Sequence, residues 1–374
     1  MKIEAINIHH VRMPLREPWR TAYGSDDAIE AVLVQLHSDG IFGWGESSPL
    51  AMPCYSSEYT AGAFGVIKNC LAPRLIGKDI HSGQELQAAL SVFKGNFFAK
   101  AALDNAWWDL HARALGQPLH KVLGGTRSTV EAGADFGIRD SLDELVELVE
   151  LVGAAVSTGA PRIKLKFAPD WGLPVLERIR SHFPKAVLHI DCNAAYAMED
   201  APLFKELHRF RLAMIEQPLA FDDLLDHASL QREIETPLCL DESINSVRRA
   251  RQAVALGACR WINIKPGRVG GLTVAKEIHD LCATAGTPCW VGGMLESSLG
   301  AMQCAALATL PNFSYPADVF PSSRFYAEDL STPAIANSSP WKFTLPSEPG
   351  TGATPQPDRL KKLTIAQAGV MKNG

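Results

Sequence analysis

The middle of the chain repeats one pattern, in which a short apolar run ends in an ionisable residue and an amphipathic segment follows. The runs end at Lys166, Asp191, Glu216, Asp241 and Lys265, with intervals of 25, 25, 25 and 24 residues. An interval of this length fits one strand, one helix and two loops. Between the runs, apolar residues recur every three or four positions, which predicts helices over residues 173–183, 201–210, 224–234, 246–256 and 272–286.

Successive strand–helix units predict an α/β fold with a TIM-type barrel, in which parallel strands alternate with helices. We expect the barrel domain to cover residues 126–330 and its first strand to lie at 129–133. In such barrels the active site lies at the carboxyl ends of the strands. The ionisable residues that end the apolar runs are therefore expected to meet at one mouth.

Residues 1–125 lack this repeat and predict a separate α+β domain. Three strands are expected near the start, over 2–13, 31–37 and 43–46, and helices over 58–71, 81–93 and 98–115. Residues 331–374 lose the strand–helix rhythm and are rich in Pro, Ser and Gly. We expect them to form a surface tail that packs on the first domain.

Composition excludes several classes of protein. The 374 residues are 47% hydrophobic, which is enough for two buried cores, and the net charge of −5 with a pI near 6.1 offers no basic surface for nucleic acid or anionic membranes. No apolar run approaches the roughly 18 residues of a membrane span, and the first residues do not open a signal peptide. The eight cysteines form no C-x-x-C pair. We expect reduced cysteines in a cytoplasmic protein.

The first of the repeated runs carries two lysines on one face. Side chains alternate along a strand, so Lys164 and Lys166 point to the same side. Two like charges are costly in a core but are reasonable at the open end of a barrel. There each ammonium is expected to lower the pKa of the other, which would leave Lys166 available as a base.

Three carboxylates follow at consecutive strand ends, namely Asp191, Glu216 and Asp241. Unpaired, they would repel one another, so they predict a bound cation. Oxygen ligands without His or Cys favour Mg²⁺, or Mn²⁺, over Zn²⁺. The structural alternative is a ring of buried salt bridges between these acids and the lysines.

Lys265 lies across the mouth from Lys166, since the three acidic strands separate them. A carboxylate-bound metal flanked by two lysines suits proton abstraction next to a carboxylate, through an enediolate. Asn193 shares a strand face with Asp191 and either contacts the ligand or caps the turn, whereas Glu242 is expected in a layer behind the metal ligands. The backbone of Gly292, Gly293 and Met294 is expected to approach the substrate closely.

These motifs, together with Lys265-Pro266-Gly267-Arg268-Val269-Gly270-Gly271, resemble the enolase superfamily and its muconate-lactonizing subgroup over nearly the whole chain. Within the subgroup, the segments 55–59, 162–166 and 292–297 are most similar to o-succinylbenzoate synthases and N-succinylamino acid racemases. The resemblance implies a (β/α)7β barrel with an α+β capping domain, and Mg²⁺ on Asp191, Glu216 and Asp241. It implies that Lys166 removes the α-proton in a syn-dehydration and that Lys265 stabilises the enolate or, in a racemase, delivers a proton from the other face.

The resemblance also implies that the capping-domain loops 14–25 and 49–60 close over a small carboxylate substrate. Candidate substrate contacts there are Trp19, Tyr23, Met52 and Tyr55. Phe136 is bulkier than expected on the second strand and is predicted to narrow the pocket. The oligomeric state is left open between monomer and homo-oligomer.

Three alternatives remain. The barrel could be a catalytically inactive binding protein, although neither lysine and none of the acids is missing. A dipeptide epimerase is disfavoured because its Asp-x-Asp is absent at 292–294. A sugar-acid dehydratase of the superfamily usually carries a histidine after the third acid, where this chain has Lys265.

Overall fold

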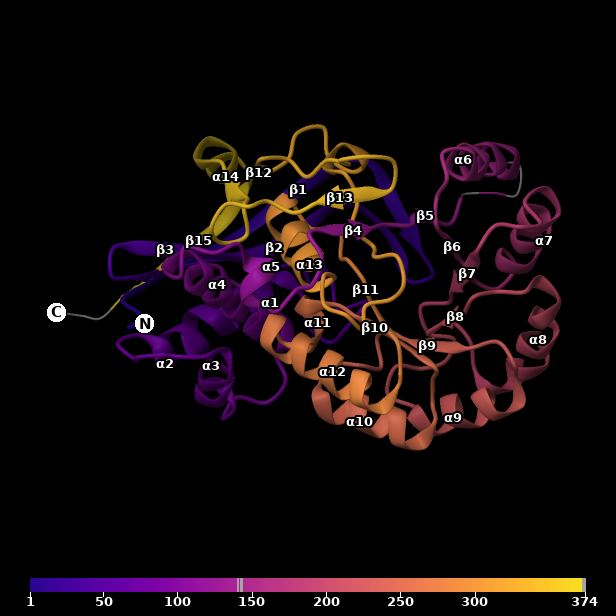
Figure 1. Ribbon diagram of the computed structural model, residues 1–374, viewed down its shortest axis with the longest axis horizontal. Coiled ribbons are helices and arrows are strands. Elements are labelled where there is room, and N and C mark those ends of the chain that lie inside the picture. The colour runs from indigo at the N-terminus through magenta and orange to yellow at the C-terminus, as the bar shows by residue number, and fades with distance from the viewer. Residues whose placement is uncertain (140, 142–143, 372–374) are drawn as a thin grey trace.

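The computed structural model describes residues 1–139, 141 and 144–371, and Figure 1 shows two bodies side by side. One is a barrel, and the other is a capping domain that contains the N-terminus. Each body has its own core of buried apolar side chains. None of the described helices combines the length and apolar character that a membrane crossing requires.

The barrel is built on a parallel sheet of seven strands, in which each strand pairs with its neighbours in sequence. They are β5 (Ala134–Phe136), β6 (Ile163–Lys166), β7 (Leu188–Asp191), β8 (Ile215–Glu216), β9 (Leu238–Leu240), β10 (Trp261–Ile264) and β11 (Cys289–Val291).

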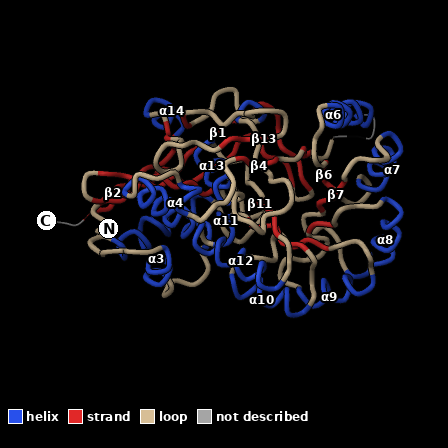
Figure 2. Tube along the Cα trace, viewed as in Figure 1, coloured by secondary structure: helices blue, strands red, loops and turns tan. Residues whose placement is uncertain are grey.

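Helices of the barrel lie outside the sheet and form an arc around it (Figure 2). They are α6 (Leu145–Ser157), α7 (Gly172–His182), α8 (Ala201–Glu206), α9 (Leu224–Glu233), α10 (Val247–Leu256), α11 (Pro266–Val269), α12 (Leu272–Ala285) and α13 (Ser298–Leu307). The five helices predicted from periodicity are all present with small shifts at their ends, and the second continues as a 3-10 turn, Leu207–Phe210.

The barrel closes through a segment without regular strand geometry. Phe313 bridges to Cys289, and Ala317 bridges to Ala132, both in parallel orientation. The amide of Asp318 donates to the carbonyl of Val291 at 2.9 Å. This segment therefore fills the eighth position, and the predicted barrel class is confirmed.

One strand prediction for the barrel was wrong. Residues 129–133 do not form its first strand, because β4 (Thr129–Glu131) pairs antiparallel with β13 (Lys342–Thr344) outside the barrel sheet. Only the central residue of β4 is buried, which suits a surface ribbon, whereas β5 has both faces covered. The first parallel strand is thus five residues later than expected.

The capping domain has an antiparallel sheet in the order β15-β1-β2-β3. Its strands are β1 (Ala5–Thr21), β2 (Gly24–Ser38), β3 (Ile41–Ser47) and β15 (Thr364–Met371). Its helices are α1 (Thr60–Val66), the π-helix Ile67–Leu71, α2 (Ala72–Leu75), α3 (Gly83–Leu90), α4 (Phe97–Ala114) and α5 (Leu119–Val122). The last strand of the tail, β15, pairs with β1 along its length.

The β1–β2 hairpin is longer than the sequence pattern indicated. Pairing is interrupted after Pro14 and resumes at Trp19, which lies opposite Asp26. Two prolines in this stretch hide the strand from periodicity, because proline cannot donate to a ladder. The hairpin tip reaches the barrel rim, where the amide of Ile138 donates to the carbonyl of Arg20 at 3.2 Å.

Close backbone packing inside the capping domain positions a residue that contacts the barrel. A Cβ atom at Gly45 would lie 2.2 Å from the carbonyl oxygen of Ala102, so only glycine lets β3 approach α4. Glu46, the next residue, accepts hydrogen bonds from the amides of Ser297 at 2.8 Å and Gly300 at 3.0 Å, at the start of α13. The cap is therefore fixed over the barrel by buried contacts.

Candidate active site

Both lysines of β6 point into the barrel mouth and are buried among carboxylates. The ammonium of Lys164 donates to Asp318 at 2.6 Å and lies 3.3 Å from Asp135 and 3.4 Å from Glu216. The ammonium of Lys166 donates to Asp191 at 2.6 Å. The shared face predicted from strand alternation is present.

The pKa of Lys164 is not lowered, as was expected from the neighbouring ammonium of Lys166. Burial opposes its positive charge, but Asp135, Glu216 and Asp191 outweigh burial and raise the pKa of Lys164. The strand face that carries two cations is surrounded by acids from neighbouring strands, and their charge decides the direction of the shift.

The three predicted metal ligands lie at adjacent positions because the parallel strands are in register. Lys166 lies opposite Asp191, and Asp191 opposite Glu216. Asp241 follows β9 directly, and its carboxylate accepts from Tyr55 at 3.1 Å. All three acids are at least 98% buried.

Each of the three acids contacts a cation. This is the arrangement of buried salt bridges that the sequence analysis gave as the alternative to a metal site. Among the described residues, no group of three His, Cys, Asp or Glu converges closely enough to hold a metal ion. Asp191 pairs with Lys166, and Asp241 pairs with Lys265 at 2.9 Å and with Arg268. Burial alone would raise the pKa of Glu216, but Lys164 and His189 lower it, so Glu216 is held ionised.

The donor set nevertheless fits a hard divalent cation. The Oε2 atom of Glu216 and the Oδ2 atom of Asp241 are buried without a well-formed hydrogen bond and face the ammonium groups of Lys164 at 3.4 Å and Lys265 at 2.9 Å. Buried carboxylate oxygens without hydrogen bonds are costly, and they are the ligands that Mg²⁺ prefers. Rotation of Lys164 and Lys265 away from these oxygens would open the site.

Lys265 approaches the mouth from the side opposite Lys166. Its ammonium lies 4.7 Å from the centre of the Tyr55 ring. Burial opposes its charge, but the nearby acids Glu242, Glu216 and Asp191 outweigh burial and raise the pKa of Lys265. The two predicted catalytic lysines thus line one cavity from different strands.

This space, the inner cavity, is small, with a volume of about 50 Å³. Nine predicted site residues line it: Trp19, Tyr23, Tyr55, Lys164, Lys166, Asn193, Lys265, Gly293 and Met294. The capping hairpin and the loop after β3 therefore close directly over the lysines.

Two predicted contacts are not where they were expected. Met52 is 67% exposed and does not line the inner cavity, because its loop points that side chain to solvent. Gly292 lies beneath the surface of the cavity, where an added Cβ atom would come within 2.8 Å of the Lys265 side chain. The same Cβ atom would lie 2.3 Å from the Asn263 side chain, so Gly292 makes room for both side chains.

Asn193 and Glu242 lie together beside Lys166. The Asn193 side chain accepts from Lys166 at 2.8 Å and donates to Glu242 at 3.0 Å. Burial, followed by the charge of Asp191, raises the pKa of Glu242 to about 7. Asn193 also lies at a turn, with a φ of 45°, and its side chain lines the inner cavity, so contact with the ligand stays a prediction.

Several buried polar residues around the lysines were not identified from the sequence. Arg162 is fully buried and pairs with both Asp135 and Asp318. Asn263 donates to Glu216 at 2.6 Å. A usable signal exists for Asn263 and Arg162, because each lies two residues before a predicted lysine and therefore on the same strand face.

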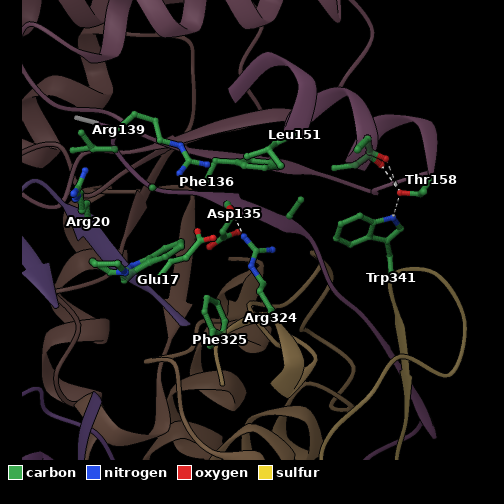
Figure 3. Close-up of a pocket in the computed structure, with 17 residues that line it drawn as sticks. Glu17, Arg20, Asp135, Phe136, Arg139, Leu151, Thr158, Arg324, Phe325 and Trp341 are labelled. Atoms are coloured by element: carbon green, nitrogen blue, oxygen red, sulfur yellow. Dashed lines mark hydrogen bonds between the residues drawn. The ribbon is translucent and has the colours of Figure 1, made fainter. Parts of the chain in front are cut away.

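A second space, the outer pocket, adjoins the inner cavity and shares Trp19 and Asp135 with it. Its volume is about 490 Å³. Figure 3 shows its walls, which come from the hairpin (Glu17, Arg20), β5 (Asp135, Phe136), α6 (Leu151) and the later chain (Arg324, Phe325, Trp341). Phe136 lines the outer pocket and does not line the inner cavity, so its effect on the width of the substrate site stays a prediction.

The chain matches two family models that together span most of its length. Residues 2–124 match the mandelate racemase / muconate lactonizing enzyme N-terminal domain, and residues 147–359 match the enolase C-terminal domain-like family.

Similar proteins share the whole architecture. An o-succinylbenzoate synthase from Geobacillus stearothermophilus is 42% identical over 94% of this chain and 93% of its own length. An N-succinylamino acid racemase from Thermus thermophilus is also 42% identical, over 90% of each chain. The crystal structure of an enolase superfamily member from Listeria innocua superimposes with a TM-score of 0.94 at 36% identity, over 99% of both chains.

Proposed function

Because the chain belongs to the enolase superfamily, and within it to the family of o-succinylbenzoate synthases and N-succinylamino acid racemases, we propose that it is an o-succinylbenzoate synthase. Its substrate would be 2-succinyl-6-hydroxy-2,4-cyclohexadiene-1-carboxylate, which loses water in a step of menaquinone biosynthesis. The observation that carries the proposal is the inner cavity, where Lys166 and Lys265 meet beside three buried carboxylates.

Enzymes of the enolase superfamily generally use Mg²⁺. Here Asp191, Glu216 and Asp241 would hold it, with Mn²⁺ as a substitute, because their buried carboxylate oxygens are hard ligands. When bound, Mg²⁺ would stabilise negative charge on the substrate carboxylate as the α-proton leaves. Glu242, behind the ligands, would hold Asn193 in place through its hydrogen bond.

Lys166 would act first. Its amine takes the α-proton, and the same group then returns the proton to the hydroxyl that leaves as water, while the new carbon–carbon double bond forms. Both transfers occur on one face, which suits a single residue at the rim of the cavity. Lys265 would stabilise the negative charge from the other face, and Lys164 would add positive charge below.

N-succinylamino acid racemisation is a second candidate, favoured by one observation. Lys265 lines the inner cavity just as Lys166 does, so both faces of an α-carbon would have a proton donor or acceptor. Dehydration needs only one such group, whereas racemisation needs two. The same site would therefore support both reactions.

A side-by-side assay tests the proposal. Purified protein is given the cyclohexadiene substrate or N-succinylamino acids, with Mg²⁺ and after its removal by a chelator, and α-proton exchange in D₂O is followed by NMR. Metal-dependent dehydration is the expected result. A protein that neither dehydrates nor exchanges α-protons would instead be an inactive barrel that serves in binding.

A further inference from the structure

The inner cavity is too small for the proposed substrate. Its 50 Å³ is far below the usual range of about 300–1,000 Å³ for small-molecule pockets. A cyclic carboxylate with a succinyl arm therefore needs space beyond the lysines. The outer pocket lies next to it, with Trp19 and Asp135 as shared walls.

The outer pocket has the dimensions and lining of a ligand site. Its 490 Å³ falls within the usual range of about 300–1,000 Å³ for small-molecule pockets. Aromatic and aliphatic side chains form most of its surface: Trp19, Phe136, Ile138, Leu151, Phe325 and Trp341. Such walls suit methylene groups, and five charged residues lie among them: Glu17, Arg20, Asp135, Arg139 and Arg324.

The arginines of the pocket differ in how they are engaged. Arg324 donates to the carbonyl of Asp135 and packs over the rings of Phe320 and Phe325 at 4.8 and 5.4 Å, so it is part of the wall. Arg139 is held more loosely, since its ion pair with Glu147 spans 4.0 Å. The Nε atom of Arg139 is buried without a hydrogen bond.

Figure 3 shows the guanidinium of Arg139 extending over the pocket toward Phe136. Glu17 and Arg20 lie on the hairpin side of the same space. Guanidinium groups bind carboxylates through two parallel hydrogen bonds, and Arg139 still has buried donor capacity. Arg139 is thus the group that an anionic end of a ligand would meet.

We propose that the outer pocket binds the succinyl arm of the substrate and that Arg139 binds its terminal carboxylate. The inference rests on the proposed function, because a succinyl arm is the feature shared by the dehydration substrate and the N-succinylamino acids. The apolar walls would contact the two methylene groups, and the reacting end would remain beside Lys166 and Lys265.

Equilibrium binding of two matched acids tests this without turnover. The probes are 2-succinylbenzoate and 2-butyrylbenzoate, which differ only in the terminal carboxylate of the arm. The wild-type protein should bind the succinyl acid more tightly. Arg139→Gln should weaken binding of the succinyl acid roughly tenfold or more and leave the butyryl acid within about twofold, since a hydrogen bond to a charged group is lost.

Four further variants sharpen the result. Arg139→Lys should restore part of the difference, and Arg248→Gln, on the exposed face of α10, should bind both acids as the wild type does. Ala154→Phe narrows the outer pocket from α6 and should weaken both acids, whereas the matched change Leu225→Phe on α9, 68% exposed, should weaken neither.

Equal affinities of the wild type for both acids, or an equal loss for both in Arg139→Gln, would overturn the inference. The proposed function is judged separately by wild-type turnover. A wild type that dehydrates its substrate yet fails the binding test rejects only the role of Arg139 and the outer pocket.

Discussion

The barrel mouth and the capping loops contribute different kinds of side chain to the same cavity. The mouth is built from buried, charged side chains at strand ends, such as Lys166 and Glu216. The loops contribute aromatic side chains, among them Trp19 and Tyr23, that close the space from above. Rigid strands hold side chains in place, whereas loops vary their shape to suit a ligand, so we propose that separate parts of the chain carry chemistry and selectivity.

Tyr55 is an exception to this division between mouth and loops. It comes from a capping loop, yet its hydroxyl donates to Asp241 and accepts from Arg268 at 2.9 Å. Burial raises its pKa to about 12, so it stays neutral. Tyr55 therefore acts with the barrel mouth and differs from its loop neighbour Met52, which is exposed.

Loss of Lys166 should have the largest effect. Lys166→Ala should lower dehydration by about 10³-fold or more, because positioned acid–base groups contribute about 10² to 10⁴ and here one residue performs both transfers. Lys265→Ala should abolish racemisation but still allow α-proton exchange of one enantiomer through Lys166. The dehydration rate measures the effect of Lys166→Ala. Single-turnover exchange in D₂O with each enantiomer measures the effect of Lys265→Ala.

Racemisation at the wild-type rate by Lys265→Ala would contradict the assignment of one lysine to each face. Lys276→Ala on α12, a lysine paired with Asp280 at the surface, is the matched control and should behave as the wild type.

Asp241→Asn should have the next largest effect. Loss of one carboxylate should weaken Mg²⁺ binding and lower turnover about 100-fold, with the fold retained, because charge at the metal falls. Calorimetric Mg²⁺ titration and circular dichroism measure the two properties. Asp222→Asn, at an exposed site before α9, is the control, and unchanged Mg²⁺ affinity in Asp241→Asn would exclude this carboxylate as a ligand.

Substitutions in the capping loops should change substrate selectivity, with smaller effects than loss of Lys166 or Asp241. Trp19→Ala removes the wall shared by both spaces and should raise KM about tenfold, to different extents for different substrates, with less change in exchange chemistry. Met52→Ala should stay within about twofold, since Met52 is exposed. KM and kcat for a substrate series provide the comparison, and an equal loss across all substrates in Trp19→Ala would argue against a role in selectivity.

Titration of Glu46, at the junction between the capping domain and the barrel, should affect stability more than activity. Burial raises the pKa of Glu46 to about 7, so the folded protein holds an extra proton between pH 4.5 and 7. The free energy of unfolding should therefore fall as pH rises through this range, by about 1–3 kcal/mol from Glu46. Urea unfolding at pH 5 and 7.5 measures the fall.

Glu46→Gln should flatten that dependence, because the amide does not titrate. Other buried acids, such as Asp104, titrate in the same range, so the difference between variant and wild type is the informative quantity. An identical fall in both proteins would show that Glu46 is not its source.

Sequence alone determined the barrel, its helices and the residues at its strand ends. The reason is that strand alternation and the 25-residue period are local properties, and parallel strands in register convert them directly into neighbours in space. The spacing of Lys166, Asp191 and Glu216 along the chain is therefore sufficient to bring them together at one mouth. The helices of the capping domain were likewise visible in local periodicity.

Only the tertiary structure decided what surrounds these residues. Asp135 and Asp318 come from opposite ends of the barrel domain and meet Arg162 because the barrel closes there, which no local pattern records. Trp19 faces the site and Met52 does not, since the orientation of a loop depends on how the cap docks on the barrel. Contacts between distant segments are set by packing of whole domains, and a period read along one chain carries no information about them.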